Sequence, residues 1–394
     1  MTKLALVTPW FGPETRGGAE DHARNLALAL RANGADLEVW TTTARDSYSD
    51  RTAHYYPAGL NEWHGLKIRR WAMDAPAMGV PPIIRKLAAK HHLLLPDHPA
   101  HEINLLGSLP NSGGLYQHIA AHPERRCIFM PYPMGTSFWG SVVANGRAFH
   151  IPCLHDEPYA YYSTYRTMLR RAEKTLFNSQ PERELALRLY DLDPAKTCVA
   201  GEGIDLHWEG DGARFRAKTG INGPILLYVG RYDFGKNVPQ LVSFFREWKA
   251  ETGRPLTFVR VGPGELPVPR AFGDWVVDLG FISPAEKHDA YAAATVFCQF
   301  STIESFSIVL MESWRQGTPA LVNAACPVTT DFALRSGGGL PCAGYREWAG
   351  ALTRLLDDAP LRERMGAAGR AFVEAECRWD DVARRVLAEV GRRK

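Results

Sequence analysis

The sequence predicts an α/β protein with two doubly wound parallel sheets. Short apolar segments of strand length alternate with helix-length segments, which is typical of a parallel sheet covered on both faces. The alternation weakens over residues 203–222, where several glycines occur, and then starts again. The length of 394 residues exceeds one ordinary domain and suits two domains of about 200 residues.

The first half begins with a strand, a glycine-containing loop and a helix. Residues 3–8 read as a buried strand, and the helix is expected over residues 19–32 with Gly34 as its C-cap. Further strands are expected at 36–42, 126–132, 149–155, 174–179 and 197–201, and helices at 159–172 and 180–190. Together these elements predict an N-terminal domain over residues 1–205.

The second half repeats the pattern. Five short apolar strands are expected at 225–230, 256–262, 275–280, 295–300 and 319–323. A helix is expected from about Phe306 to Gln316, because Ser305 or Ser307 suits its N-cap and Gly317 suits its end. These elements predict a second domain over residues 206–377, followed by a terminal helix over 378–394. The two sheets would face a central cleft at the carboxyl ends of their strands.

Composition excludes several classes of function. The net charge of +3 gives no indication of a nucleic-acid partner. The seven cysteines are scattered without a CxxC pair, which predicts reduced thiols in a cytoplasm and neither a zinc site nor a disulfide framework. No segment is apolar for the length that a membrane span requires. A cytoplasmic protein is expected, with peripheral attachment to the inner face of the plasma membrane as an alternative.

Residues 46–65 and 73–113 fit the alternation of strands and helices poorly. Within them, residues 83–95 mix basic and apolar side chains. This composition suits a helix on an anionic membrane surface, and it also suits an ordinary amphipathic surface helix. We favour the ordinary surface helix.

The segment TIESFSIVLMES, residues 302–313, places Glu304 and Glu312 at the two ends of an uncharged stretch. Glu304 is expected in the loop after a strand, and Glu312 inside the following helix, about 9 Å along its axis. Carboxylates spaced in this way can hold two ends of an elongated ligand. The amides at the helix start, near Ser307 and Ile308, would suit a phosphate between those ends.

This E-x7-E arrangement resembles the signature of retaining glycosyltransferases of family 4, which have the GT-B fold. Other segments resemble that family across nearly the whole chain: TPWFGPETRGGAEDHARNLALAL, ILLYVGRYDFGKN, LGFISPAEKHDAYAAATVFCQFSTIESFSIVLMESWRQGTPALVN and RWDDVARRVLAEV. The resemblance implies an N-terminal acceptor-binding domain, a C-terminal donor-binding domain, and a terminal helix that crosses back to the N-terminal domain.

The resemblance also implies roles for residues of the second domain. Arg231 and Lys236 would neutralise the donor diphosphate, which supports departure of the nucleotide. Glu304 would position hydroxyls of the donor sugar and Glu312 the ribose. Further donor-binding positions are Gly262, Ile282, Ser307 and Ile308. Aromatic residue Phe281 is expected in the core. The family usually has glycine where this chain has Ser307.

In the first domain, Gly17 and Gly18 between the first strand and helix would allow close approach of a phosphate or sugar. His155 ends a strand, where the family has a histidine near the donor sugar and the reaction centre; a histidine packed under the loop is the alternative. The candidates for acceptor contacts are Arg16, Asp156, Glu157 and Tyr159.

The function expected from the resemblance is transfer of a hexosyl group from a UDP- or GDP-linked sugar to a hydroxyl acceptor, without a metal or other cofactor. A glycan or a lipid-linked glycan in bacterial surface polysaccharide synthesis is the expected acceptor. One alternative is a nucleotide-sugar epimerase, which would convert its substrate without an acceptor. Another is a non-catalytic subunit that binds glycan or nucleotide-sugar; the presence of Glu304, Arg231 and Lys236 together argues against it.

Overall fold

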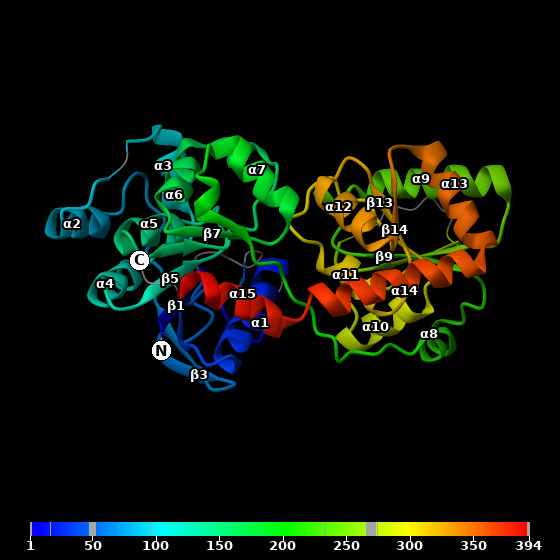
Figure 1. Cartoon of the computed structure of the whole chain (residues 1–394), viewed down its shortest axis with the longest axis horizontal. Coiled ribbons are helices and arrows are strands. Elements are labelled where there is room, and N and C mark those ends of the chain that lie inside the picture. Colours follow the sequence, from blue (N-terminus) through cyan, green and yellow to red (C-terminus); the bar gives the residue numbers. More distant parts are fainter. Residues whose placement is uncertain are drawn as a thin grey trace. The chain divides into compact units, whose positions relative to one another are not determined.

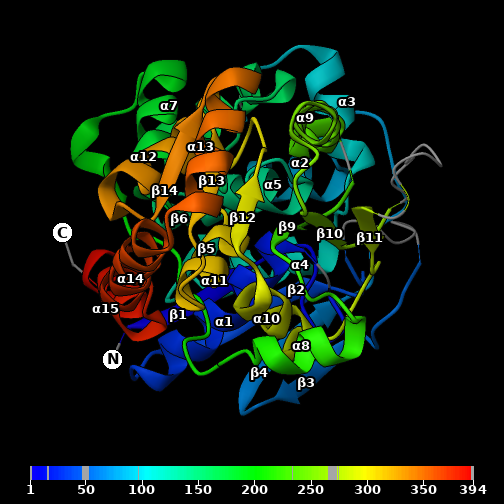
Figure 2. The ribbon, with the colours of Figure 1, turned by 90° about the vertical axis from the view of Figure 1, so that its right-hand side faces the viewer.

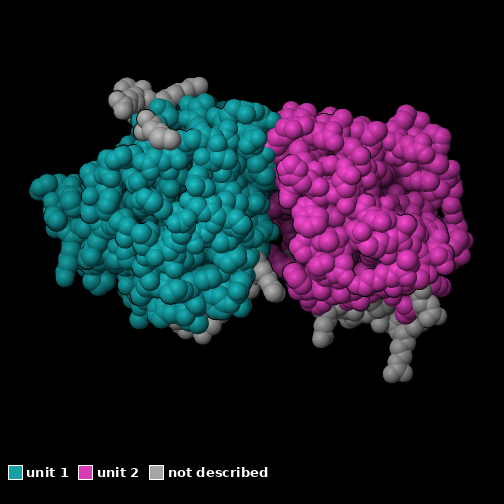
Figure 3. All heavy atoms as spheres, turned by 90° about the horizontal axis from the view of Figure 1, so that it is seen from below, with its two compact units in different colours: residues 1–203, 379–394 teal, residues 204–378 magenta. Residues whose placement is uncertain are grey.

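The computed structural model (Figure 1) describes residues 2–15, 17–46, 53–95, 97–232, 234–264, 273 and 275–391, without the side chain of residue 234. Contacts divide the chain into two compact units, coloured separately in Figure 3. Unit 1 comprises residues 1–203 and 379–394, and unit 2 comprises residues 204–378. No helix among the described residues is long and apolar enough to cross a membrane.

Unit 1 is built on an eight-stranded sheet in the order β3-β4-β2-β1-β5-β6-β7-β8, with β3 antiparallel to β4 and the other neighbours parallel. The strands are β1 (Lys3–Val7), β2 (Asp36–Thr42), β3 (Gly59–Trp63), β4 (Leu66–Trp71), β5 (Arg126–Phe129), β6 (Ala148–His150), β7 (Lys174–Phe177) and β8 (Thr197–Val199). The helices are α1 (Gly18–Ala32), α2 (Pro82–His91), α3 (Ala100–Ser108), α4 (Gly113–Ala121), α5 (Gly135–Ala144), α6 (Ser163–Arg171), α7 (Gln180–Tyr190) and α15 (Trp379–Val390), with short 3-10 turns η1 (Pro158–Tyr161) and η2 (Pro194–Lys196).

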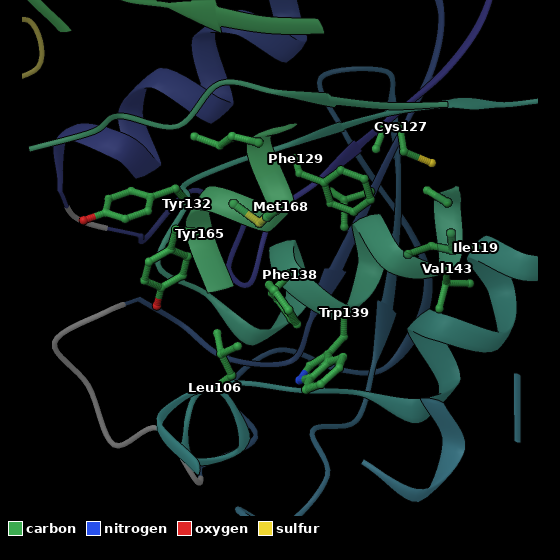
Figure 4. Close-up of a cluster of buried hydrophobic side chains, with 14 of the residues drawn as sticks. Leu106, Ile119, Cys127, Phe129, Tyr132, Phe138, Trp139, Val143, Tyr165 and Met168 are labelled. Atoms are coloured by element: carbon green, nitrogen blue, oxygen red, sulfur yellow. The ribbon is translucent and has the colours of Figure 1, made fainter. Parts of the chain in front are cut away.

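Alternate residues of β1 enter different cores, which is why this strand is apolar from Leu4 to Val7. Ala5 and Val7 belong to the core that contains Phe129, Trp139 and Met168 of neighbouring elements, drawn in Figure 4. Leu4 and Leu6 belong to the core on the opposite face of the sheet. The sheet is therefore covered on both faces, as the continuous apolar strands predict.

The terminal helix α15 packs on α1 in unit 1, after the chain has passed through unit 2. Leu26 and Leu30 of α1 share a buried core with Val382 and Val386 of α15. The Arg385 side chain adds a hydrogen bond from Nε to the carbonyl oxygen of Ala200, 2.7 Å away. The predicted return of the C-terminal helix to the N-terminal domain is confirmed.

Unit 2 is built on a six-stranded, fully parallel sheet in the order β11-β10-β9-β12-β13-β14. The strands are β9 (Ile225–Val229), β10 (Thr257–Val261), β11 (Val276–Asp278), β12 (Val296–Gln299), β13 (Ala320–Asn323) and β14 (Gly339–Cys342). The helices are α8 (Gly212–Thr219), α9 (Val238–Thr252), α10 (Pro284–Ala293), α11 (Ile308–Arg315), α12 (Pro327–Ser336), α13 (Tyr345–Asp357) and α14 (Ala359–Glu376), with a 3-10 turn η3 (Phe234–Lys236).

Helices lie on both faces of this second sheet (Figure 2). Leu226 and Tyr228 of β9 join a core with α9 and α13, whereas Leu227 and Val229 join a core with α10 and α11. Both units therefore have the predicted doubly wound α/β architecture.

Two segments differ from the sequence-based expectation. Residues 203–222, where the alternation weakens, contain α8, whose packing on α10 makes it part of unit 2. Residues 73–113, which fitted no pattern, contain α2, α3 and the start of α4. In α2, Ile84 and Leu87 are buried while Arg85, Lys86 and Lys90 are exposed, the arrangement of an amphipathic surface helix.

Candidate donor site in unit 2 and candidate acceptor site in unit 1

The order of strands in unit 2 reverses direction at β9, because β10 lies on one side of it and β12 on the other. In open α/β sheets such a switch point opens a crevice at the carboxyl ends of the strands, where ligands bind. The loop after β9 carries Lys236, and the loop after β12 carries Glu304. The topology thus brings together two predicted site residues that are 68 positions apart in sequence.

The carboxylate of Glu304 has two donors on one oxygen. Lys236 Nζ lies 2.6 Å from Glu304 Oε1, and Gln299 Nε2 donates to the same oxygen over 2.8 Å. Gln299 is the last residue of β12 and is 1% exposed. The side chains of Lys236 and Glu304 are 23% and 9% exposed, so the pair is shielded from most of the solvent. A shielded ion pair interacts more strongly than one on the surface.

Glu312 lies inside α11 and is held from the neighbouring helix α10. Lys287 Nζ is 2.6 Å from Glu312 Oε1, and the Tyr291 hydroxyl donates to Oε2 over 3.0 Å. Lys287 and Tyr291 are four residues apart on α10 and therefore lie on the same helix face. Burial and the nearby Glu312 raise the pKa of Tyr291, so the hydroxyl keeps its proton and remains a donor.

Ser307 precedes α11 in a left-handed conformation, with φ 84° and ψ 73°. Few residues other than glycine adopt this conformation. The serine side chain does not cap the helix; its Oγ lies 3.4 Å from Gln299 Nε2. The following amide, of Ile308, is the first of α11.

The ends of β9 and β10 approach each other closely at Gly262. A β-carbon at this position would lie 2.1 Å from the carbonyl oxygen of Gly230, and φ is +134°, so both space and conformation require glycine. Arg231, beside Gly230, is exposed. Ile282 is partly buried against a core of unit 2. Phe281 was expected in the core, and this expectation is wrong: its side chain is 64% exposed, because the loop after β11 carries it outward.

At the start of α1 in unit 1, Gly17 adopts φ +137° and the helix begins at Gly18. A β-carbon on Gly17 would lie 2.3 Å from Oε2 of Glu20, at the movable end of that side chain, so it is the φ of +137° that favours glycine here. The loop is held by Arg24, which donates to the carbonyl oxygen of Thr15 over 2.7 Å. Arg16, a predicted acceptor contact, lies outside the described residues.

The loop after β6 contains His155 and Glu157. His155 Nδ1 is 3.8 Å from Glu157 Oε1, and the Tyr132 hydroxyl donates to the same oxygen over 2.8 Å. Burial, and then the charge of Glu157, raise the pKa of Tyr132, which keeps this hydroxyl a donor. The His155 side chain is 35% exposed, which is intermediate between a histidine packed under the loop and one open to solvent.

The other two predicted acceptor contacts lie in the same loop. Asp156 accepts from the Tyr161 hydroxyl over 2.7 Å and lies 3.8 Å from Arg188, away from the His155–Glu157 pair. The Tyr159 ring stacks on Tyr132 with centroids 6.0 Å apart. Glu157 and Tyr159 are therefore grouped around Tyr132, whereas Asp156 is directed toward other partners.

Reasoning from the sequence missed the residues that hold the predicted carboxylates. Gln299 carried a detectable signal, since it is a polar residue at the carboxyl end of the apolar strand VFCQ. Lys287 and Tyr291 carried none, because an exposed-looking lysine and an aromatic residue are ordinary on a surface helix. The tyrosine Tyr132, which holds Glu157, was likewise indistinguishable from a core residue.

Comparison with known proteins gives a family match in unit 2. Residues 211–372 match the family model described as "Glycosyl transferases group 1". A D-inositol 3-phosphate glycosyltransferase of Frankia alni is 34% identical over 239 residues, covering 54% of this chain and 57% of that protein. The enzyme of the same name from Kineococcus radiotolerans is 30% identical over 240 residues, covering 54% and 55%. The chain thus spans little more than half the length of these relatives.

Solved structures match over nearly the whole chain. Sucrose-phosphate synthase from Thermosynechococcus elongatus superposes with a TM-score of 0.68 at 19% identity, covering 98% of this chain and 97% of that one. HepE of Anabaena, solved in complex with UDP, superposes with a TM-score of 0.69 at 14% identity, covering 99% of both chains. These likenesses establish the fold: two Rossmann-like domains of the GT-B class.

Proposed function

We propose that this protein is a retaining glycosyltransferase, which moves a hexosyl residue from a UDP- or GDP-linked sugar to a hydroxyl acceptor. The observation that carries the proposal is the Lys236–Glu304 pair, 2.6 Å apart at the switch point of unit 2. That unit is also the part of the chain that matches the glycosyltransferase group 1 model. HepE, of the same fold, has been solved with UDP and with UDP-glucose.

In this proposal unit 2 binds the donor. Lys236 and the exposed Arg231 face the diphosphate and offset the negative charge that grows on it as it departs. Glu304 accepts hydrogen bonds from hydroxyls of the sugar, and Glu312 accepts from the ribose. The amide of Ile308 faces a phosphate oxygen, and the backbone at Gly262 and Ile282 borders the nucleoside. These side chains supply positive charge at the diphosphate, so the proposal includes no metal ion.

Unit 1 would bind the acceptor, with His155 and the group around Glu157 nearest to it, whereas Gly17 and Gly18 would contact a phosphate or sugar of the donor. The bond between the anomeric carbon and the donor phosphate oxygen breaks, and the acceptor oxygen bonds to that carbon on the same face. The acceptor proton passes to the departing phosphate oxygen. His155 orients the reacting hydroxyl, and no side chain acts as a covalent nucleophile.

The acceptor is proposed from the chemistry of relatives. The curated relatives are named for D-inositol 3-phosphate, so a phosphorylated polyol is the first acceptor to test. WaaG, a neighbour of the same fold with a TM-score of 0.67, is described as involved in lipopolysaccharide biosynthesis, which makes a lipid-linked glycan the second.

Membrane attachment remains a proposal that one feature of unit 1 supports. Arg85, Lys86 and Lys90 form an exposed basic face on α2, and Met78 and Leu94 beside this helix are 78% and 76% exposed. Such a face suits anionic headgroups, at about 1 kcal/mol per basic residue. Co-sedimentation with phosphatidylglycerol vesicles but not with phosphatidylcholine vesicles is expected, and equal recovery with both would contradict it.

The test of the main proposal begins with a panel of UDP- and GDP-sugars in a thermal-shift assay. The best donor is then incubated with each acceptor, and the anomeric configuration of the product is read by NMR. Retention supports the proposal and inversion contradicts it. Conversion of the donor sugar without an acceptor would indicate an epimerase, and binding without any turnover would indicate a non-catalytic subunit.

A further inference from the structure

We propose that Gln299 and Ser307 form a buried polar pair that positions Glu304 for the donor sugar. The inference rests on the proposed function. It adds Gln299 as a positioning residue that does not touch substrate, and it gives the Ser307 hydroxyl a positioning role besides the donor contact expected from the sequence. Gln299 is the last residue of β12 and Ser307 directly precedes α11, so the two residues lie on either side of Glu304 in the sequence.

Gln299 directs its amide nitrogen at a cluster of three oxygens. Nε2 lies 2.8 Å from Glu304 Oε1, 3.1 Å from Ser301 Oγ and 3.4 Å from Ser307 Oγ. The hydrogen bond to the carboxylate is the shortest of the three and is strengthened by its charge. Gln299 ends a strand and is 1% exposed, so its amide contacts Glu304 from the buried end of β12. Lys236, in the loop after β9, contacts the same oxygen.

The orientation of the Gln299 amide is unfavourable for the stability of the fold. Gln299 Oε1 is buried and accepts no hydrogen bond from any described residue. A buried carbonyl without a donor is unfavourable, and an apolar side chain of similar size would avoid the loss. A polar residue at such a position indicates a role beyond packing, and the contact of its nitrogen with Glu304 supplies that role.

Ser307 carries a second local cost. Its φ of 84° lies in the region that glycine adopts without strain and serine does not. Ser307 is 6% exposed, and its hydroxyl does not cap α11. It lies instead within 3.4 Å of the Gln299 amide. Gln299, with its unpaired carbonyl oxygen, and Ser307, with its left-handed backbone, therefore contact each other beside Glu304.

A carboxylate held in this way is orientated before the donor binds. Preorganised groups accelerate a reaction when they fit the transition state, so a small displacement of Glu304 should lower turnover more than affinity. The Gln299–Ser307 pair would thus affect kcat with the donor sugar and leave the binding of the nucleoside diphosphate unchanged.

The first test replaces the amide by an apolar group of similar size. In the Gln299→Leu variant we expect kcat to fall about tenfold, with the Kd for UDP or GDP and the Tm within error of the parent or the Tm raised. The matched control is Asn323→Leu, which changes another buried amide at the end of the adjacent strand β13; Asn323 bonds to the Phe300 carbonyl and not to Glu304. We expect the control to lose thermal stability and keep kcat.

The second test uses Gln299→Glu. If Gln299 had only a structural role, the ratio of kcat between this variant and the parent would not change with pH. The introduced carboxyl can donate to Glu304 only while it is protonated. Its ordinary pKa is about 4.3, and burial next to a carboxylate raises it. Relative to the parent, kcat should therefore be highest at low pH and fall as pH rises through this raised pKa.

Two outcomes would overturn the inference: an unchanged kcat in Gln299→Leu, or a flat ratio of kcat to the parent across pH in Gln299→Glu. Failure of the proposed function itself is separable. If Glu304→Gln retains full turnover, Glu304 has no role in transfer and the premise fails. If Glu304→Gln is inactive while Gln299→Leu equals the parent, only the positioning role fails.

Discussion

Glu304 and Glu312 each meet a lysine at 2.6 Å and one neutral donor, yet these contacts are distributed differently. Lys236 and Gln299 share one oxygen of Glu304 and come from two loops or strand ends at the switch point of the sheet. Lys287 and Tyr291 each take a different oxygen of Glu312 and come from one face of α10.

This difference indicates distinct consequences for the fold. The contacts of Glu312 join α10 to α11, so they stabilise the packing of two helices as well as fixing a carboxylate. The contacts of Glu304 join the ends of β9 and β12, at the edge where ligands bind in such sheets. Changes around Glu304 should therefore alter activity with little effect on stability, and changes around Glu312 should alter both.

The largest expected effect is on Glu304 itself. Glu304→Gln keeps the shape of the side chain and removes its charge, so we expect turnover to fall about 100-fold or more while the Kd for UDP or GDP stays within about threefold. Glu312→Gln is the matched control. It should weaken nucleotide binding about tenfold and lower the Tm, because Lys287 loses its partner. Equal effects of the two changes on kcat would remove the distinction between the carboxylates.

The next effect concerns the two cations after β9. Lys236→Ala should lower kcat about 100-fold, because it removes the positive charge that faces the diphosphate and also a hydrogen-bond donor to Glu304. Arg231→Ala, at an exposed position, should lower kcat about tenfold. Steady-state kinetics with the identified nucleotide-sugar provide the measurement, and turnover unchanged in both variants would contradict their proposed role.

A smaller effect is expected at Lys287. Lys287→Met keeps an apolar stem over α11 and removes the charge, so the Kd for UDP or GDP should rise about fivefold, with kcat unchanged and the Tm lowered. Tyr291→Phe removes the donor to the other oxygen of Glu312 and serves as a companion variant. Calorimetric titration measures the Kd, and thermal unfolding measures the Tm. A loss of kcat without a change in Kd would instead give Lys287 a role in turnover, like the residues that contact Glu304.

Some strands and helices could be predicted from the sequence, and others could not. Strands such as β1 and β9 were predictable because all their residues except Lys3 are buried, and their apolar runs have the right length. The strand β14 (GLPC) was missed, since glycine and proline normally mark turns. The helix α8 was missed because only Phe215 of its eight residues is buried, which leaves almost no periodicity.

The same reasoning applies to the candidate site. Glu304, Glu312 and Lys236 were named from a resemblance, and the place of Glu304 before a helix followed from local signals. Their partners depend on contacts between elements far apart in sequence: Lys287 is 25 positions from Glu312, and Lys236 is 68 from Glu304. No local periodicity reports such pairs, so only the packing of α10 on α11 and of β9 beside β12 identifies them.

The smallest expected effect is at Ser307, where strain and a hydroxyl can be separated by two substitutions. Ser307→Gly relieves the left-handed conformation and should stabilise the fold by about 1 kcal/mol. Ser307→Ala keeps the strain and should not stabilise. Both remove the hydroxyl 3.4 Å from Gln299, so both should lower kcat by the same two- to threefold. Thermal unfolding and kinetics on the two variants provide the check. If Ser307→Gly kept full turnover while Ser307→Ala lost it, backbone strain rather than the hydroxyl would be what affects Glu304.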